Sequence, residues 1–146
     1  MAADPTKQLL RSAPYFPVAD VEKSATHYER TLGFSREAVA GSPPEFAIMT
    51  RDGFPIMLRL VPDPTRISPN ERQGGTWDAF FWVSDVRALH AELRAAGADI
   101  AYDVTYQAGY QMDEFAARDL DGYVLGFGQS VTAVRDSQQS TPIQSA

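Results

Sequence analysis

An internal repeat constrains the fold of this chain more than any other feature of its sequence. The segment FPVADVEKSATHYERTLGF begins at Phe16, and the segment FWVSDVRALHAELRAAGAD begins at Phe81. Once these phenylalanines are aligned, three further positions match: Val18 with Val83, Asp20 with Asp85, and Val21 with Val86. A repeat of this kind predicts two copies of one structural unit.

Each copy predicts a short strand followed by a capped helix. After the shared aspartate, apolar residues recur at spacings of three and four, which places them on one helical face. Asp20 and Asp85 are expected to be N-caps, and Gly33 and Gly97 stand where a C-cap glycine is needed. The expected buried positions are Val21, Ala25, Tyr28 and Leu32 in the first copy and Val86, Leu89, Leu93 and Ala96 in the second.

Three short strands are expected after each helix. They are FSREAVA, PEFAIMTRDG and FPIMLRLV in the first copy, and DIAYDVTYQ, MDEFAARDLDG and YVLGFGQ in the second, with turns at RDG and DLDG. The repeated unit is therefore βαβββ, and the predicted fold class is α+β. We expect an N-terminal extension (1–12), a first module (13–60), a Pro/Gly-rich linker (61–76), a second module (77–129) and a polar C-terminal tail (130–146).

Composition excludes several classes of function. The chain has 146 residues and a formal net charge of −6, which argues against nucleic acid and anionic membranes as partners, since both are bound through basic patches. It contains no cysteine, so it has neither a thiolate metal site nor a cysteine nucleophile. No apolar run approaches the roughly 20 residues needed to cross a bilayer, and the opening residues lack an apolar signal region. We expect a cytoplasmic protein.

The combined pattern resembles the vicinal oxygen chelate superfamily, which includes glyoxalase I, extradiol dioxygenases, fosfomycin-resistance enzymes and bleomycin-resistance proteins. The resemblance spans residues 13 to 129 and rests on the tandem units, the V-x-D pattern before each helix, the HYERTLGF segment, and RDLDGYVLGF as a near match to the DPDG hairpin. It implies that each sheet forms half of a cupped, partly open barrel around a ligand cavity. It also implies a homodimer, as do the apolar strand edges near Ala13–Val18 and Ala79–Val83.

The resemblance also identifies the positions where metal-using members carry their ligands. In this chain those positions hold Ala13, Arg59, Asp78 and Gly126. Alanine and glycine have no ligating side chain, the charge of Arg59 would repel a cation, and one carboxylate is not a metal site. We therefore expect no metal and no cofactor.

Catalytic residues are not predicted either. The two histidines, His27 and His90, both fall in helical segments and are interpreted as surface residues. The alternative is a metal ligand donated across a dimer interface. No serine, histidine and aspartate arrangement is visible in the sequence.

The expected binding surface is apolar and aromatic. Strand alternation puts Asp78, Phe80 and Trp82 on one face, and the resemblance assigns that face to the cup. Gly126 is interpreted as open volume for a bulky ligand. The alternative is that the aromatic residues fill the core or a subunit interface. The expected ligand-binding residues are Met57, Arg59, Asp78, Phe80, Trp82, Tyr110, Met112 and Gly126.

These observations predict a metal-free protein that sequesters a small aromatic or amphipathic molecule. Bleomycin-resistance proteins sequester their drug in this way, so antibiotic resistance is the implied role. Two alternatives stay open. One is a metal-dependent lyase, isomerase or dioxygenase with a degenerate site, and the other is a module whose concave face binds a protein partner.

Overall fold

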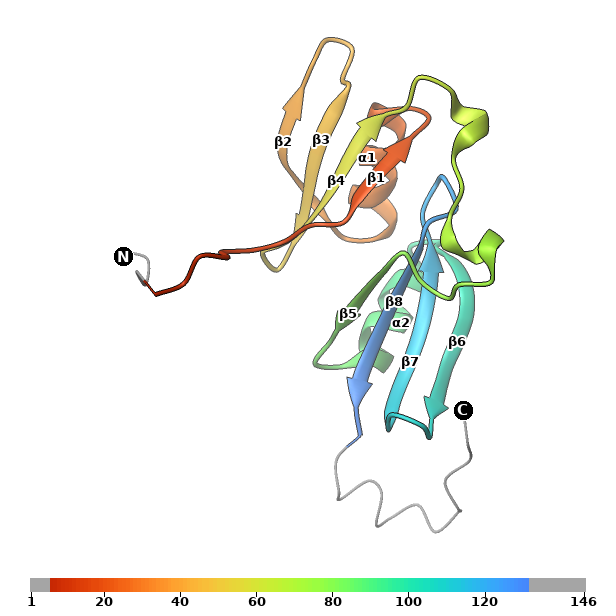
Figure 1. Cartoon of the computed structure of the whole chain (residues 1–146). Helices are drawn as coiled ribbons and strands as arrows, with labels where there is room; N and C mark the ends of the chain where they lie inside the picture. Colours follow the sequence, from red (N-terminus) through yellow and green to blue (C-terminus); the bar gives the residue numbers. More distant parts are fainter. Residues whose placement is uncertain (1–5, 132–146) are drawn as a thin grey trace. The chain divides into compact units, whose positions relative to one another are not determined.

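The computed structural model describes residues 6–131, which divide into two compact units (Figure 1). The first unit comprises the described residues up to Glu29 together with Gly33–Ile67, and the second comprises Arg30–Leu32 and the described residues from Ser68 onward. Each unit contains one four-stranded sheet and one helix in the order βαβββ. The predicted α+β fold with two tandem βαβββ modules is therefore confirmed, and neither sheet is closed into a barrel.

The first sheet has the strand order β1-β4-β3-β2. Its strands are β1 (Tyr15–Val18), β2 (Ser35–Ala40), β3 (Phe46–Arg51) and β4 (Phe54–Leu60), with α1 (Val21–Thr31) between β1 and β2. Strand β1 runs parallel to β4, whereas the other two pairs are antiparallel. The β3–β4 turn consists of Asp52 and Gly53, both with positive φ, as expected for a tight hairpin.

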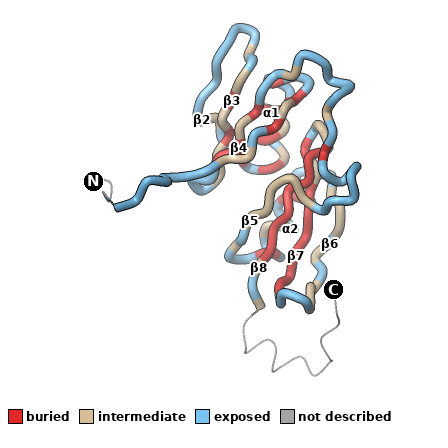
Figure 2. The backbone as a smooth tube through the Cα atoms, in the orientation of Figure 1, coloured by how far each residue is buried: buried red, intermediate tan, exposed pale blue. Residues whose placement is uncertain are grey.

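The second sheet repeats this topology with the order β5-β8-β7-β6. Its strands are β5 (Ala79–Trp82), β6 (Asp99–Gln107), β7 (Met112–Arg118) and β8 (Val124–Ser130), with α2 (Val86–Ala95) between β5 and β6. Figure 2 shows that β7 and β8 are buried along most of their length. These two central strands carry the core of the second unit.

The predicted caps are present in both helices. The carboxylate of Asp20 accepts a hydrogen bond from the amide of Lys23 (2.9 Å), and that of Asp85 accepts one from the amide of Ala88 (3.1 Å). Gly33 and Gly97 have the positive φ that a C-cap glycine supplies. The expected face of the first helix is fully buried, but only two of the four expected positions of the second helix, Val86 and Leu93, are buried.

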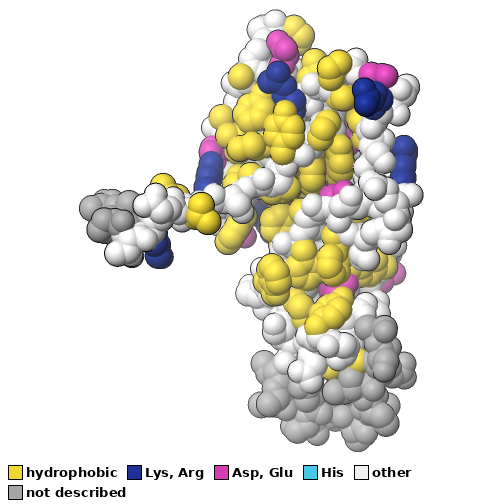
Figure 3. Space-filling view, viewed as in Figure 1, with side chains coloured by type: hydrophobic (Ala, Val, Ile, Leu, Met, Phe, Trp, Pro, Cys, Tyr) yellow, Lys and Arg dark blue, Asp and Glu magenta, His cyan; other side chains and the backbone are white. Residues whose placement is uncertain are grey.

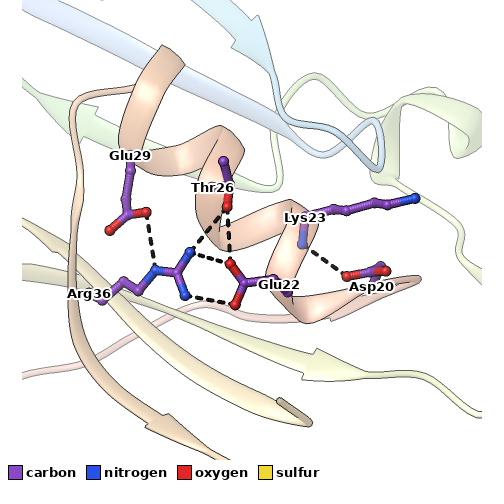
Figure 4. A network of polar contacts seen from close by, with 6 residues as sticks. All are labelled: Asp20, Glu22, Lys23, Thr26, Glu29 and Arg36. Atoms are coloured by element: carbon purple, nitrogen blue, oxygen red, sulfur yellow. Dashed lines mark hydrogen bonds and ion pairs between the residues drawn. The ribbon is translucent and has the colours of Figure 1, made fainter. Parts of the chain in front are cut away.

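An arginine on β2 holds the first helix against its sheet (Figure 4). The Arg36 guanidinium makes two hydrogen bonds to Glu22 (2.7 and 2.9 Å), and it also contacts Glu29 (3.1 Å) and Thr26 (3.1 Å). Its hydrogen bonds lower the pKa of the Glu22 carboxyl below the usual value. Because the pairing is exposed, it orients the helix more than it stabilises the fold.

The segment between β4 and β5 contains two short 3₁₀ helices, Pro64–Arg66 and Asn70–Gln73, which sequence analysis did not predict. Glu71 of the second one accepts two hydrogen bonds from Arg118 of β7, at 2.8 and 3.0 Å. This part of the linker is therefore fastened to the second sheet. Within residues 6–131, neither helix is long enough to cross a membrane.

Candidate functional site

Strand β5 carries three aromatic residues in succession, Phe80, Phe81 and Trp82, whose side chains alternate between the two faces of the sheet. Phe81 stacks on Phe127 with ring centroids 5.6 Å apart, and Phe127 in turn stacks on Phe115, which also contacts the ring of His90 on α2. Phe81 therefore belongs to the face that the helix covers. Because strand alternation sends neighbours to opposite faces, Phe80 and Trp82 lie on the face away from α2.

This second face carries a row of three aromatic rings. The Phe80 ring lies between Trp77 and Trp82, with centroid distances of 4.6 and 5.0 Å. Trp82 is 74% exposed, so it is not a core residue of its unit. Figure 3 is drawn from the side away from α2 and shows hydrophobic side chains gathered there. We call this surface the aromatic face; it comprises Trp77, Phe80, Trp82, Tyr102, Tyr110, Met112 and Glu114.

Two glycines of β8 lie beneath these side chains. A Cβ atom on Gly126 would stand 2.6 Å from the Trp77 ring and 2.7 Å from the Phe80 ring. A Cβ atom on Gly128 would stand 2.6 Å from Phe80 and 2.7 Å from the methyl group of Met112. The interpretation of Gly126 as open volume for a ligand is therefore wrong, because the chain's own aromatic side chains occupy that space.

A buried carboxylate lies beside the aromatic rings. Glu114 of β7 is 1% exposed, and each of its oxygens accepts one hydrogen bond from a tyrosine hydroxyl. Tyr102 of β6 donates to Oε2 at 2.5 Å, and Tyr110 of the β6–β7 turn donates to Oε1 at 2.5 Å. The indole N–H of Trp77 donates to the Tyr102 hydroxyl at 2.8 Å, which directs that hydroxyl hydrogen toward Glu114.

The environment keeps both tyrosines protonated. Burial raises the pKa of Tyr102 well above its usual value, and the hydrogen bond to Glu114 raises it further. The same two causes, in the same order, raise the pKa of Tyr110. Ionising either phenol would place a second negative charge against the carboxylate, so both tyrosines act as hydrogen-bond donors.

Asp78 has a structural role that its sequence context did not reveal. One carboxylate oxygen accepts a hydrogen bond from the amide of Asn70 (2.9 Å), and the other accepts one from the amide of Val124 (2.8 Å). Asp78 therefore ties the linker to the start of β8. Its expected role in orienting a ligand stays a prediction.

The predicted residues of the first module lie on the sheet face away from α1. Ile56 and Leu58 of β4 are fully buried, whereas Met57 between them is partly exposed and Arg59 is exposed. This alternating burial places Met57 and Arg59 on the face away from α1. Their contact with a ligand stays a prediction.

The donor set at the family's ligand positions does not fit a metal ion. Ala13 and Gly126 offer no side-chain donor atom, Arg59 offers a cation, and the carboxylate of Asp78, which already accepts from two backbone amides, is the one ligating side chain that remains. Among residues 6–131, no group of three or more histidine, aspartate and glutamate side chains could hold a metal.

The histidines differ from their expected surface positions. His27 and His90 are both partly buried, and His90 lies over Phe115 while its Nε2 atom contacts the Asp103 carboxylate at 2.9 Å. His90 therefore takes part in packing α2 on its sheet. It lies on the face opposite to the aromatic face.

Sequence analysis missed Glu114, Tyr102 and Trp77 as site residues. The sequence of β7 could have indicated Glu114. By strand alternation Met112, Glu114 and Ala116 share one face, so an acidic residue stands between two apolar ones. Glu114 was overlooked because its partners are tyrosines from β6 and the following turn, which only the folded sheet brings together.

Comparison with known proteins settles the family. The model of the Glyoxalase/Bleomycin resistance protein/Dioxygenase superfamily matches residues 11–127. The chain belongs to this superfamily. A search of curated proteins found no match to the chain.

Several solved structures share the fold of this chain. TioX from Micromonospora sp. ML1 is 23% identical, with a TM-score of 0.66 over 84% of this chain and 99% of that one. A bleomycin resistance determinant encoded on the transposon Tn5 is 20% identical, with a TM-score of 0.66 over 85% of this chain and 100% of that one. The bleomycin-binding protein from bleomycin-producing Streptomyces verticillus, complexed with copper(II)-bleomycin, is 21% identical, with a TM-score of 0.63 over 87% and 100%.

Proposed function

We propose that this superfamily member binds a small aromatic or amphipathic molecule without a metal and sequesters it without transforming it. Two of its structural relatives carry descriptions that name bleomycin resistance and bleomycin binding, and these descriptions support a binding role. If the ligand is an antibiotic, sequestration confers resistance. The cytoplasmic location stays a prediction.

The exposure of Trp82 is the observation that carries the proposal. A tryptophan that is 74% exposed and held edge-on against Phe80 presents a large apolar ring to its surroundings. Tyr110 on the same face is 46% exposed. Planar ligands stack on such rings, and the nearby polar group fixes their orientation. We therefore propose Phe80, Trp82, Tyr110 and Met112 as contacts, with Glu114 as the polar group.

A metal-dependent enzyme is a weaker candidate for this chain. Such an enzyme needs several donors around one ion, and Asp78 is the one ligating side chain among the family's four ligand positions, Ala13, Arg59, Asp78 and Gly126. A protein-interaction module needs the same exposed apolar surface as a ligand-binding protein. The binding experiment below separates these two.

Tryptophan fluorescence provides the direct test of this proposal. The chain contains two tryptophans, and both belong to the aromatic face, so a bound planar compound should quench the emission saturably. We expect at least one compound from a panel of planar aromatic molecules to do so. If no compound binds saturably, the interaction-module interpretation is favoured.

A tryptophan variant locates the binding surface. Trp82→Ala should weaken binding of the quenching compound by about 1–3 kcal/mol, because a stacked ring is lost. Its stability should change by less than about 0.5 kcal/mol, because the side chain is mostly exposed. Calorimetric titration and thermal melting measure the two quantities.

The matched control for this experiment is Phe54→Ala. Phe54 is 63% exposed at the start of β4 in the other module, and its replacement should leave the affinity unchanged. Equal affinities for wild type and Trp82→Ala would show that the ligand lies elsewhere.

We also propose that the protein is a homodimer. Strands β1 and β5 are edges of their sheets, and each carries an exposed aromatic residue, Tyr15 in β1 and Trp82 in β5. An edge strand presents unpaired backbone groups that favour association.

A further inference from the structure

We infer that the ligand carries a positively charged group, a protonated amine attached to its aromatic part, and that Glu114 receives this group. The inference rests on the proposed binding function and adds the chemical class of the ligand. The observations that support it are the burial of Glu114, its two tyrosine partners and the aromatic rings beside it.

Glu114 is buried without a counter-charge. Within residues 6–131 its contacts are the hydroxyls of Tyr102 and Tyr110, and no lysine or arginine pairs with it. A carboxylate removed from water is normally paired with a cation, because two neutral donors compensate only part of the lost solvation. Glu114 is therefore a buried carboxyl group to which two neutral phenols and no cationic side chain are hydrogen-bonded.

The carboxylate also has acceptor capacity to spare. A carboxylate offers about four lone-pair positions, of which the two phenols occupy two. An ammonium group has three N–H donors and no acceptor, so it can use the remaining positions while it supplies the missing charge.

Aromatic rings lie within the same part of the sheet. Gly128 is the register partner of both Trp82 and Glu114, and it contributes no side chain between them. The tip of the Phe80 ring and the methyl group of Met112 lie over this glycine. A cation is attracted to the faces of such rings, most strongly to tryptophan. Charge and rings together suit an aromatic amine.

Tyr110 controls access to the carboxylate. Tyr102 is held on its other side by the indole of Trp77, whereas Tyr110 lies in the β6–β7 turn and is 46% exposed. Movement of Tyr110 would uncover Oε1 of Glu114, and the incoming ammonium group would replace the tyrosine hydroxyl there. Tyr110 thus occupies the cation position in the free protein.

The test compares three probes that share one ring system. The probes are similar in size and differ in charge: naphthylmethylammonium is positive, naphthylmethanol is neutral and naphthoate is negative. Calorimetric titration of the full chain should show the ammonium compound binding at least tenfold more tightly than the alcohol, and the carboxylate binding more weakly than both. The preference should persist in high salt, where the general attraction of a protein of net charge −6 is screened.

Two variants assign the preference to Glu114. Glu114→Gln should remove the preference for the ammonium over the alcohol, so that the two probes bind with similar affinity. Tyr110→Phe should keep or increase the preference, because it removes the competitor for Oε1. The control is Asp113→Asn, which removes a buried carboxylate that pairs with Arg87 on the opposite face of the same strand and should preserve the preference.

The outcomes separate the inference from the proposed function. Equal binding of all three probes, with loss in Trp82→Ala, overturns the inference and leaves the proposed function standing. An ammonium preference that survives in Glu114→Gln, or that disappears in Tyr110→Phe, also overturns it. If none of the probes binds, both fail. The wild-type comparison decides the ligand's charge even if Glu114→Gln does not fold.

Discussion

At the scale of single residues, the glycines of β8 show what strand alternation can and cannot predict. Alternation correctly placed Phe80 and Trp82 on one face, because side-chain direction in a strand depends only on position. It could not show what covers Gly126. Trp77 precedes β5 and reaches over the neighbouring strand, which depends on rotamers and register that a sequence pattern does not contain.

The packing over Gly126 predicts that a larger residue at this position destabilises the protein. Gly126→Ala should destabilise the protein by about 1–3 kcal/mol, because the new methyl group forces the Trp77 and Phe80 rings to move. If the space over Gly126 were open, the same substitution should stabilise the protein instead. Alanine reduces the conformational freedom of the unfolded chain relative to glycine, so folding costs less entropy. Chemical denaturation measures the difference.

A double variant provides the control for the glycine experiment. In a Trp77→Ala background the space over residue 126 is partly free, so Gly126→Ala should cost less there than in the wild type. Equal costs in both backgrounds would mean that Trp77 is not the obstacle.

At the scale of elements, the internal repeat predicted the order of strands and helices because each copy carries its own local signals. The capping aspartates, the C-cap glycines and the Asp52–Gly53 turn all have the predicted roles. The two 3₁₀ helices of the linker were missed, because their proline and polar residues are also typical of irregular loops. The register shifts between β6 and β7 left no signal in the residue pattern.

The edge strands β1 and β5 predict that the protein forms a dimer. Light scattering at micromolar concentration should show a dimer, since the unpaired edges of β1 and β5 favour association. Tyr15→Lys places a charge on the exposed face of β1 and should shift the protein toward the monomer. Phe54→Lys, at a similarly exposed aromatic position at the start of β4, should remain dimeric. A monomeric wild-type protein would contradict the dimer.

At the scale of the whole molecule, the sequence was sufficient for the family and the fold but not for the site. The tandem units and their spacing identified the superfamily that the family model matches over residues 11–127. The group that best indicates a ligand class, Glu114 with its two tyrosines, forms only when β6, the following turn and β7 come together. Local patterns do not contain such contacts, because the partners are selected by the register of the folded sheet.

The central claim is that the protein binds its ligand without a metal. The most direct test is to titrate the protein with the aromatic compound that quenches its tryptophans, before and after exhaustive treatment with a chelator, and to determine metal content by elemental analysis. We expect the same dissociation constant in both titrations and no stoichiometric divalent ion, because the family's ligand positions carry only one ligating side chain, Asp78. One equivalent of tightly held metal, with binding lost when it is removed, would contradict the account.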